Sequence, residues 1–386
     1  MPQDIVFSFF LIFAGALVLA TVALYTRQPV LVAYIALGGI AGPYGMGWIE
    51  HPDELIDMAH IGIIFLLFLL GLDMQPSALF SVLRKAMLVA LISSLLFFGI
   101  GAGITFILGF SSMDAVIVGL ACMFSSTIIG LKLLPTTVLH HKHSGDLMVG
   151  LLLIQDMIAI LTLILLGVME GESDTPVWQP FIALPLLAVG CYLIVKFVLL
   201  PLIKRFDRYQ EYLFIMAIGW CLAVAEGAAM MGLSAEIGAF IAGVTLATSP
   251  IAQFMAISLK PLRDFFLVMF FFTLGAGVNL DLLGDVIWGA ALLAGAVLLL
   301  KPVIFRILLG KMSESSTLAW DVGFRLGQIS EFSLLVAFVA LESALLSERG
   351  SLLIQATAII TFIISSYIVV FNYPNPIAVK DKLRRD

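Results

Sequence analysis

Charged residues are scarce in this chain. Lysine, arginine, aspartate and glutamate make up 12% of the 386 residues, whereas hydrophobic residues make up 61%. Soluble domains carry about 25% charged residues, so this composition excludes a soluble globular protein and indicates a polytopic membrane protein. A formal net charge of −6 also leaves no basic excess that would favour nucleic acid as a partner.

Cysteine is also rare, and the three present are Cys122, Cys191 and Cys221. All three fall inside apolar segments without the spacing of a metal site, so we interpret them as packing residues. The sequence shows neither a nucleophile–base pair nor a metal motif, and we expect a transporter without an organic cofactor rather than an enzyme. The N-terminus lacks the basic segment of a cleaved signal peptide, so we expect the first apolar segment to be retained.

Long apolar runs are abundant, and windows of roughly 17–25 residues mark membrane spans. The pattern predicts an all-α protein of about thirteen spans. The weakest boundary is the Met-Gly-Leu-Ser turn between the eighth and ninth spans. The predicted spans are 4–25, 30–48, 55–71, 86–109, 114–134, 147–168, 178–203, 211–231, 233–248, 263–280, 286–309, 318–340 and 350–372.

The distribution of basic residues predicts the orientation of these spans. Fifteen of the 20 lysine and arginine residues fall in one alternating set of loops and the tail, whereas the opposite set holds only Arg349. Basic loops face the cytoplasm, so we expect the N-terminus outside and the C-terminus inside. Spans 1–6 and 8–13 then form two six-helix repeats of inverted topology, joined by 178–203, as in many secondary transporters.

The span 147–168 contains Gln155 and Asp156 near its middle. An aspartate at the centre of a membrane helix costs roughly 2.5–3.5 kcal/mol on insertion scales, so such residues mark functional sites by default. Three further polar groups lie at a similar predicted depth, roughly 10–20 Å from the inner face. They are Ser125–Thr127, Lys301 and the segment from Gln328 to Glu331. Each repeat supplies two of these groups, which is where a transporter's ion site is expected.

Each group admits more than one role. Asp156 can bind a proton or a monovalent cation but not both well, and this competition is sufficient for antiport. Lys301 can neutralise Asp156, release it when a cation arrives, or do both. The hydroxyls of Ser125–Thr127 can bind a cation where a helix is broken, or simply pack. Glu331 can balance helix N-terminal dipoles or pair with Arg325, although a six-residue separation does not place the two on one helix face.

Several motifs together resemble one family. The segment 151–160 reads LLLIQDMIAI, the segment 124–134 reads FSSTIIGLKLL and the segment 327–335 reads GQISEFSLL. With GLSAEIGAFIAGVTLA at 232–247 and FFTLGAGVNL at 271–280, these motifs resemble the cation:proton antiporter-2 family. The similarity is specifically to the membrane domain of Kef-type potassium:proton antiporters, and it covers nearly the whole chain.

The resemblance implies an NhaA-like antiporter fold, with the fifth and twelfth spans discontinuous and crossed, and a homodimer in the bilayer. Asp156 would carry the proton or cation, with Gln155 and Ser125, Ser126 and Thr127 at the binding site. Lys301 would be the charge partner within the membrane, and Gln328, Ser330, Glu331 and Arg325 would support the crossing helices. The implied regions are a dimerisation scaffold (4–71 and 211–280), a transport core (86–168 and 286–372) and a linker helix (178–203).

The implied function is electroneutral K⁺/H⁺ exchange by an elevator-type movement, serving pH homeostasis in a bacterial inner membrane. Gln155 stands where electrogenic relatives have a second acid. The alternatives are a Na⁺/H⁺ antiporter of the same fold and a ligand-gated K⁺ efflux system that behaves like a channel, although no TVGYG filter sequence is present. Kef proteins carry a nucleotide-binding domain that this chain lacks, so we expect a separate regulatory subunit or a missing C-terminal domain.

Overall fold

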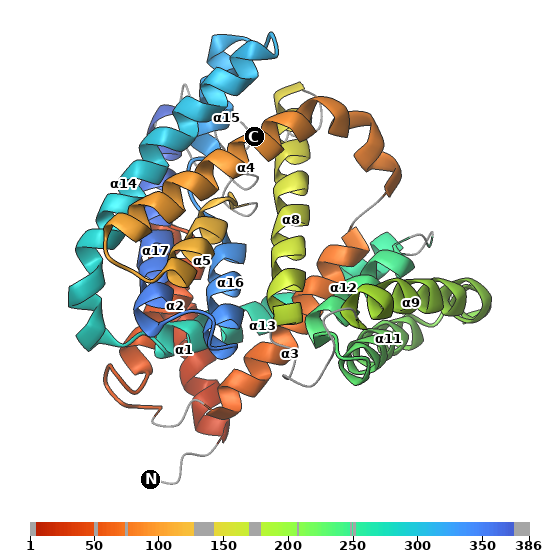
Figure 1. Cartoon of the computed structure of the whole chain (residues 1–386). Helices are drawn as coiled ribbons and strands as arrows, with labels where there is room; N and C mark the ends of the chain where they lie inside the picture. Colours follow the sequence, from red (N-terminus) through yellow and green to blue (C-terminus); the bar gives the residue numbers. More distant parts are fainter. Residues whose placement is uncertain are drawn as a thin grey trace. The chain divides into compact units, whose positions relative to one another are not determined.

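The structure is a computed structural model. It describes residues 5–49, 53–73, 76–126, 143–169, 179–206, 208–247, 249 and 252–373 (Figure 1). Within these ranges every regular element is a helix, as the apolar composition predicts. The chain divides into two compact units. They are Met1–Trp48 with Leu79–Thr162 and Leu274–Asp386, and Ile49–Ala78 with Leu163–Thr273.

The first unit contains the predicted site. Here α14 packs against α15 and α17, while α5 packs against α16 and α17 (Figure 1). The bounds of its helices are α1 (Ile5–Tyr25), α2 (Val30–Ala41), most of α4 (Pro76–Ile107), α5 (Ser112–Cys122), most of α8 (His143–Met169), α14 (Leu280–Lys311), α15 (Ser316–Arg325), α16 (Glu331–Glu342) and α17 (Glu348–Asn372).

The second unit is built around the pair formed by α3 and α12. It also contains one segment in which an α-helix passes through a π-helical turn and continues as an α-helix. The bounds are α3 (Asp53–Asp73), α9 (Gln179–Ile194), η1 (Val195–Leu199), α10 (Leu200–Phe206), α11 (Gln210–Met230), α12 (Ala235–Leu246) and most of α13 (Ala252–Ala276). The predicted division into scaffold and core stays a prediction, because these two units group α1 and α2 with the helices predicted for the core.

Seven of the described helices are long and apolar enough to cross a membrane, and four shorter ones are also apolar. Each predicted span overlaps a described helix, but the number of crossings and the inverted repeats stay predictions. The end of the second span was wrong: it was predicted to reach 48, but its helix ends at Ala41 because Pro43 forces Gly42 into an extended conformation (ψ 178°). The twelfth span, 318–340, is divided into α15 and α16, as expected for a discontinuous span.

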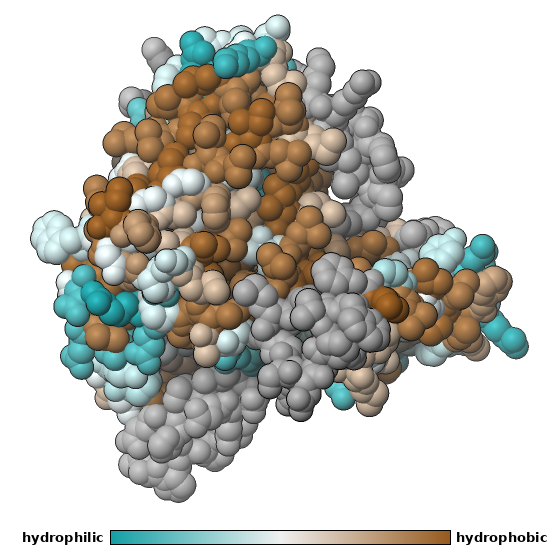
Figure 2. Space-filling view, viewed as in Figure 1, coloured by the Kyte–Doolittle hydropathy of each residue, from teal (hydrophilic) through white to brown (hydrophobic). Residues whose placement is uncertain are grey.

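The surface of the first unit is largely apolar. Figure 2 shows hydrophobic residues over much of the upper part of the visible face, with hydrophilic residues at its top edge. Exposed side chains of α4 and α14 include Leu95, Ile107, Trp288 and Leu299, each at least 68% exposed. An exposed apolar area of this extent is unfavourable in water and indicates a membrane-facing surface.

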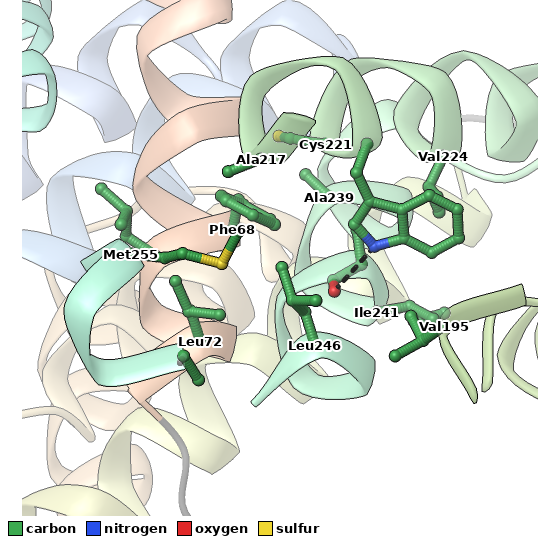
Figure 3. Close-up of a cluster of buried hydrophobic side chains, with 14 of the residues drawn as sticks. Phe68, Leu72, Val195, Ala217, Cys221, Val224, Ala239, Ile241, Leu246 and Met255 are labelled. Carbon is green, nitrogen blue, oxygen red and sulfur yellow. Dashed lines mark hydrogen bonds between the residues drawn. The ribbon is translucent and has the colours of Figure 1, made fainter. Parts of the chain in front are cut away.

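The second unit encloses its own hydrophobic core, which includes Phe68 and Leu72 of α3 together with Ile241 and Leu246 of α12 (Figure 3). Close approach of α3 and α12 depends on glycine. A Cβ at Gly71 would lie 2.5 Å from the carbonyl oxygen of Phe240, and one at Gly243 would overlap the carbonyl oxygen of Phe68. Small residues let membrane helices approach in this way.

We expect Gly243→Ala to destabilise the protein, because the new methyl group meets backbone atoms of α3 that cannot move aside. Overpacking of this kind costs roughly 1–3 kcal/mol. The melting temperature in detergent should fall by about 1–4 °C. Gly227→Ala in α11 is the matched control, because a Cβ there has no heavy atom within 4 Å and should leave stability equal or slightly higher. Equal melting temperatures for both variants would contradict the packing argument.

Candidate functional site

The first interruption follows α5. Ser111 caps the N-terminus of this helix by accepting a hydrogen bond from the backbone N–H of Asp114 (3.0 Å). The helix ends at Cys122, and the backbone is not helical through Ser126. Ser125 and Ser126 are both fully buried. Thr127, the third predicted hydroxyl, lies outside the described residues.

The second interruption separates α15 from α16, where residues 326–330 are not helical. Ser330 restarts the helix by accepting a hydrogen bond from the N–H of Phe332 (3.1 Å), and Ser333 accepts one from the N–H of Ser330 (3.2 Å). This reciprocal capping explains why the chain becomes helical again at Glu331. The hydroxyl of Ser330 also lies 3.5 Å from the Glu331 carboxylate, so the predicted Ser330 and Glu331 lie at the start of α16.

The two interruptions contact one another although about half of the chain separates them in sequence. The hydroxyl of Ser125 donates to the carbonyl oxygen of Leu326 (2.9 Å), and the side-chain amide of Gln328 donates to the carbonyl oxygen of Ser126 (3.4 Å). Backbone groups freed by the breaks therefore find partners in the facing segment, which non-helical backbone at membrane depth requires. The structure thus has the crossed, discontinuous helices that the resemblance implies.

Lys301 of α14 is inserted at this crossing and is only 1% exposed. Its ammonium donates to the carbonyl oxygens of Phe124 (2.7 Å) and Gln328 (3.1 Å), and to the hydroxyl of Ser125 at 3.4 Å. The ammonium also lies 4.8 Å from the centre of the Phe97 ring, where a cation is favoured. The ammonium of Lys301 therefore binds backbone oxygens just beyond the C-terminal ends of α5 and α15, where helix dipoles are negative.

Gln155 and Asp156 lie on α8 beside the first interruption. The amide oxygen of Gln155 accepts a hydrogen bond from the backbone N–H of Ser125 (3.2 Å). Its amide nitrogen is buried, with no hydrogen-bond partner among the described residues. Asp156 is 3% exposed. The structure brings Gln155, Ser125, Ser126, Gln328 and Lys301 together, whereas the predicted ion pair between Lys301 and Asp156 stays a prediction.

Sequence reasoning missed the contribution of α17 and α16. Ser365 of α17 donates its hydroxyl to the side-chain oxygen of Gln328 (2.8 Å), and Thr361 accepts a bond from the N–H of Ile329 (3.4 Å). Ser333 of α16 donates to the carbonyl oxygen of Ala121 (2.6 Å). The hydroxyls on α17 recur every fourth residue in an otherwise apolar segment, and this spacing was the signal that could have revealed them.

Arg325, at the end of α15, is 2% exposed and forms an ion pair with Asp321 one turn earlier (2.8 Å). Its guanidinium also lies 5.8 Å from the centre of the Tyr373 ring. Burial raises the pKa of the Tyr373 phenol above its ordinary value; the Asp321 carboxylate adds to the rise and the Arg325 guanidinium opposes it. Arg325 thus lies directly before the second interruption with Asp321 as an ion-pair partner, and its support of the crossing helices stays a prediction.

A family model described as "Sodium/hydrogen exchanger, transmembrane" matches residues 9–371. The chain belongs to the sodium/hydrogen exchanger family. This chain of the exchanger family is an integral membrane protein, since both its long apolar helices and its transporter fold are those of such a protein.

In the part of the chain that the structure describes, no group of three or more histidine, cysteine, aspartate or glutamate side chains could hold a metal ion.

Relatives of this exchanger-family chain include three K(+) efflux antiporters of Arabidopsis thaliana. K(+) efflux antiporter 6 is 29% identical over 352 residues, 87% of this chain and 58% of the relative. K(+) efflux antiporter 5 is 31% identical over 336 residues, 82% of this chain and 57% of the relative. The match to K(+) efflux antiporter 4 is similar, at 29% identity. The chain thus spans less than two thirds of the length of these relatives.

The fold is similar to that of the sodium proton antiporter MjNhaP1 from Methanocaldococcus jannaschii at pH 8. The TM-score is 0.68 at 17% identity, over 93% of this chain and 94% of the other. A second structure of the same antiporter, an electron microscopy map, gives a TM-score of 0.64 over 95% of each chain. At this identity the similarity establishes the antiporter fold.

In this exchanger-family chain, the arrangement places a buried carboxylate beside the first interruption, which itself contacts the second. The side chains of Gln155, Ser125 and Gln328 surround the crossing with amide and hydroxyl groups, and Lys301 places its amino group there. A carboxylate and neutral oxygens are the ligands that hard cations take. Such a site can bind an alkali cation or a proton at the Asp156 carboxylate. The negative charge of this carboxylate disfavours anions.

Proposed function

We propose that this protein is a monovalent cation:proton antiporter that exchanges K⁺ for H⁺ without net charge movement. Asp156 binds a cation when the site faces one side of the membrane, and a proton displaces that cation when the site faces the other side. In both loaded forms the negative charge of the carboxylate is neutralised, by the bound cation in one and by the proton in the other. The site therefore carries one positive charge in each direction.

The observation that supports this proposal most is the position of Gln155 next to Asp156. Asp156 is 3% exposed, and Gln155 joins its helix to the first interruption through the backbone N–H of Ser125 (3.2 Å). An amide in this place cannot take up a second proton as a carboxylate would. One titrating acid in the Gln155–Asp156 pair, where a second acid would bind a second proton, supports a stoichiometry of one cation for one proton.

Potassium is the proposed cation because the curated relatives are named K(+) efflux antiporters. The structural neighbour is named a sodium proton antiporter, so Na⁺/H⁺ exchange on the same site is the alternative within the family. The rest of the proposal includes a homodimer, an elevator-type movement of the core and a regulatory subunit or domain. It also places the protein in a bacterial inner membrane with the N-terminus outside and the C-terminus in the cytoplasm, as a transporter rather than an enzyme and without an organic cofactor.

The test uses the purified chain in proteoliposomes that contain a pH-sensitive dye. After a pH gradient is formed, adding K⁺ should dissipate it, Na⁺ should act more weakly, and Li⁺ more weakly still. A membrane potential is then imposed on the vesicles with an anion gradient, without valinomycin or a protonophore. The initial rate should not change. A rate that changes with potential would contradict electroneutral exchange.

Two other results would decide between alternatives. A stronger response to Na⁺ than to K⁺ would replace potassium with sodium in the proposal. Large unitary currents in planar bilayers, with no coupling of cation flux to proton flux, would identify the channel-like K⁺ efflux system instead. No response to any of the three cations would overturn the antiporter proposal for this chain on its own.

A further inference from the structure

The buried face of α17 carries three hydroxyl groups at four-residue spacing. Thr357 donates to the carbonyl oxygen of Leu353 (2.6 Å) in its own helix, and Thr361 donates to that of Ala358 (3.0 Å). Ser365 differs from both, because its hydroxyl donates away from α17 to the side-chain oxygen of Gln328 (2.8 Å). Ser365 is 1% exposed. A buried hydroxyl directed at a residue of the crossing has a role that helix packing alone does not require.

Gln328 is fully buried and connects three parts of the crossing. Its backbone oxygen accepts a hydrogen bond from the ammonium of Lys301 (3.1 Å). Its side-chain nitrogen donates to the carbonyl oxygen of Ser126 (3.4 Å), and its side-chain oxygen accepts the hydroxyl of Ser365. The nitrogen end of this amide thus has a partner that only one orientation can satisfy, and the hydroxyl of Ser365 donates to the oxygen end in that same orientation.

The chemistry of the two partners determines that orientation. A backbone carbonyl accepts hydrogen bonds and never donates them, so the amide nitrogen must face Ser126. The hydroxyl of Ser365 then stabilises the amide oxygen on the opposite side. Without that donor, only the 3.4 Å hydrogen bond to Ser126 favours this orientation over the second one that the terminal torsion of glutamine allows. Rotation would turn the oxygen toward the crossing and leave the Ser126 carbonyl without the amide.

We propose that Ser365 is a positioning residue of the cation site, which it controls by holding the Gln328 amide in a single orientation. This inference rests on the proposed function. The orientation determines how many oxygen atoms face a cation near the crossing, because the nitrogen of Gln328 occupies one carbonyl and repels a cation. Alkali cations of different size differ in the number and distance of the oxygens they need. Ser365 therefore contributes to cation affinity and selectivity without touching the cation.

The test compares Ser365→Ala with Ser366→Ala in the proteoliposome assay. Ser366 is the next residue of α17 and is also buried, at 3% exposure. We expect Ser365→Ala to raise the KM for K⁺ by about three- to ten-fold, the effect of one lost neutral hydrogen bond. The kcat should change by less than about two-fold, and the preference for K⁺ over Na⁺ should decrease. Ser366→Ala should leave all three quantities within about two-fold of wild type.

Cysteine variants keep the test decisive if either alanine variant fails to fold. The thiol of Ser365→Cys is a weak donor at the same position, so its KM for K⁺ should lie between those of wild type and Ser365→Ala, whereas Ser366→Cys should match wild type. Unchanged KM and selectivity in folded Ser365 variants, or equal changes at both positions, would overturn the role of Ser365 while leaving antiport intact. Absence of exchange by the wild-type chain would instead overturn the proposed function, and this inference with it.

Discussion

Replacing Asp156 with asparagine should abolish cation:proton exchange. The amide is nearly isosteric with the carboxylate, but it neither binds a proton at neutral pH nor neutralises a cation. Exchange should fall to the rate of protein-free vesicles, a loss of at least about 100-fold, because both transported ions depend on one carboxylate. The measurement is the decay of a pH gradient after addition of K⁺, Na⁺ or Li⁺ to proteoliposomes.

Thermal melting in detergent measures folding and cation binding independently of transport. A ligand that binds only the folded state raises the melting temperature with its concentration. K⁺ should therefore stabilise wild type and fail to stabilise Asp156→Asn. Asp264→Asn is the control, because Asp264 is 58% exposed and pairs with the neighbouring Arg263. Exchange by folded Asp156→Asn at a rate near that of wild type would refute the central role of this carboxylate.

Replacing Lys301 with methionine should both destabilise the protein and stop transport. Methionine fills a similar volume, but the carbonyl oxygens of Phe124 and Gln328 lose their shared donor inside the protein. Hydrogen bonds to charged groups contribute about 1.5–3 kcal/mol each, so the two together predict a loss of roughly 3 kcal/mol or more. The melting temperature should decrease strongly, and the little folded protein that remains should show no exchange.

Lys196→Met provides the matched control for this experiment. Lys196 lies in η1 with an exposed side chain, 5.8 Å from the centre of the Tyr192 ring and 5.6 Å from that of Phe197. Loss of an exposed cation–π contact costs only about 0.5–1 kcal/mol. Its melting temperature should stay close to that of wild type. A stable, active Lys301→Met protein would show that neither interruption needs the ammonium.

The sequence predicted the site from residues that are costly in a membrane. Asp156, Lys301 and Gln328 each stand out in an apolar span, and a common depth places them together without any structure. The partners of Lys301 could not be predicted in the same way. Two of them are backbone oxygens, of Phe124 and Gln328, and every residue has such an oxygen. Only the positions of the breaks make these particular oxygens available.

Other differences had signals that were present in the sequence. Asp321 and Arg325 are four residues apart, the spacing of an ion pair on one helix face, and the structure has that pair. Pro43 likewise indicated that the second helix would end before 48. Ser365 was harder to identify, because hydroxyl groups in membrane helices usually bond to their own backbone. Thr357 follows that rule, and Ser365 is the exception.

The contacts between the two interruptions join residues that are 201 and 202 positions apart. At a synthesis rate of about 5–20 residues per second, the ribosome needs roughly 10–40 seconds to proceed from Ser125 to Leu326. During that time Gln155 can already accept the backbone N–H of Ser125, while the partners of the Phe124 and Ser126 carbonyl oxygens, Lys301 and Gln328, do not yet exist. Biogenesis therefore includes an intermediate in which carbonyl oxygens of the first interruption lack their final partners, and membrane-embedded chaperones or the translocon itself would have to shield them from lipid.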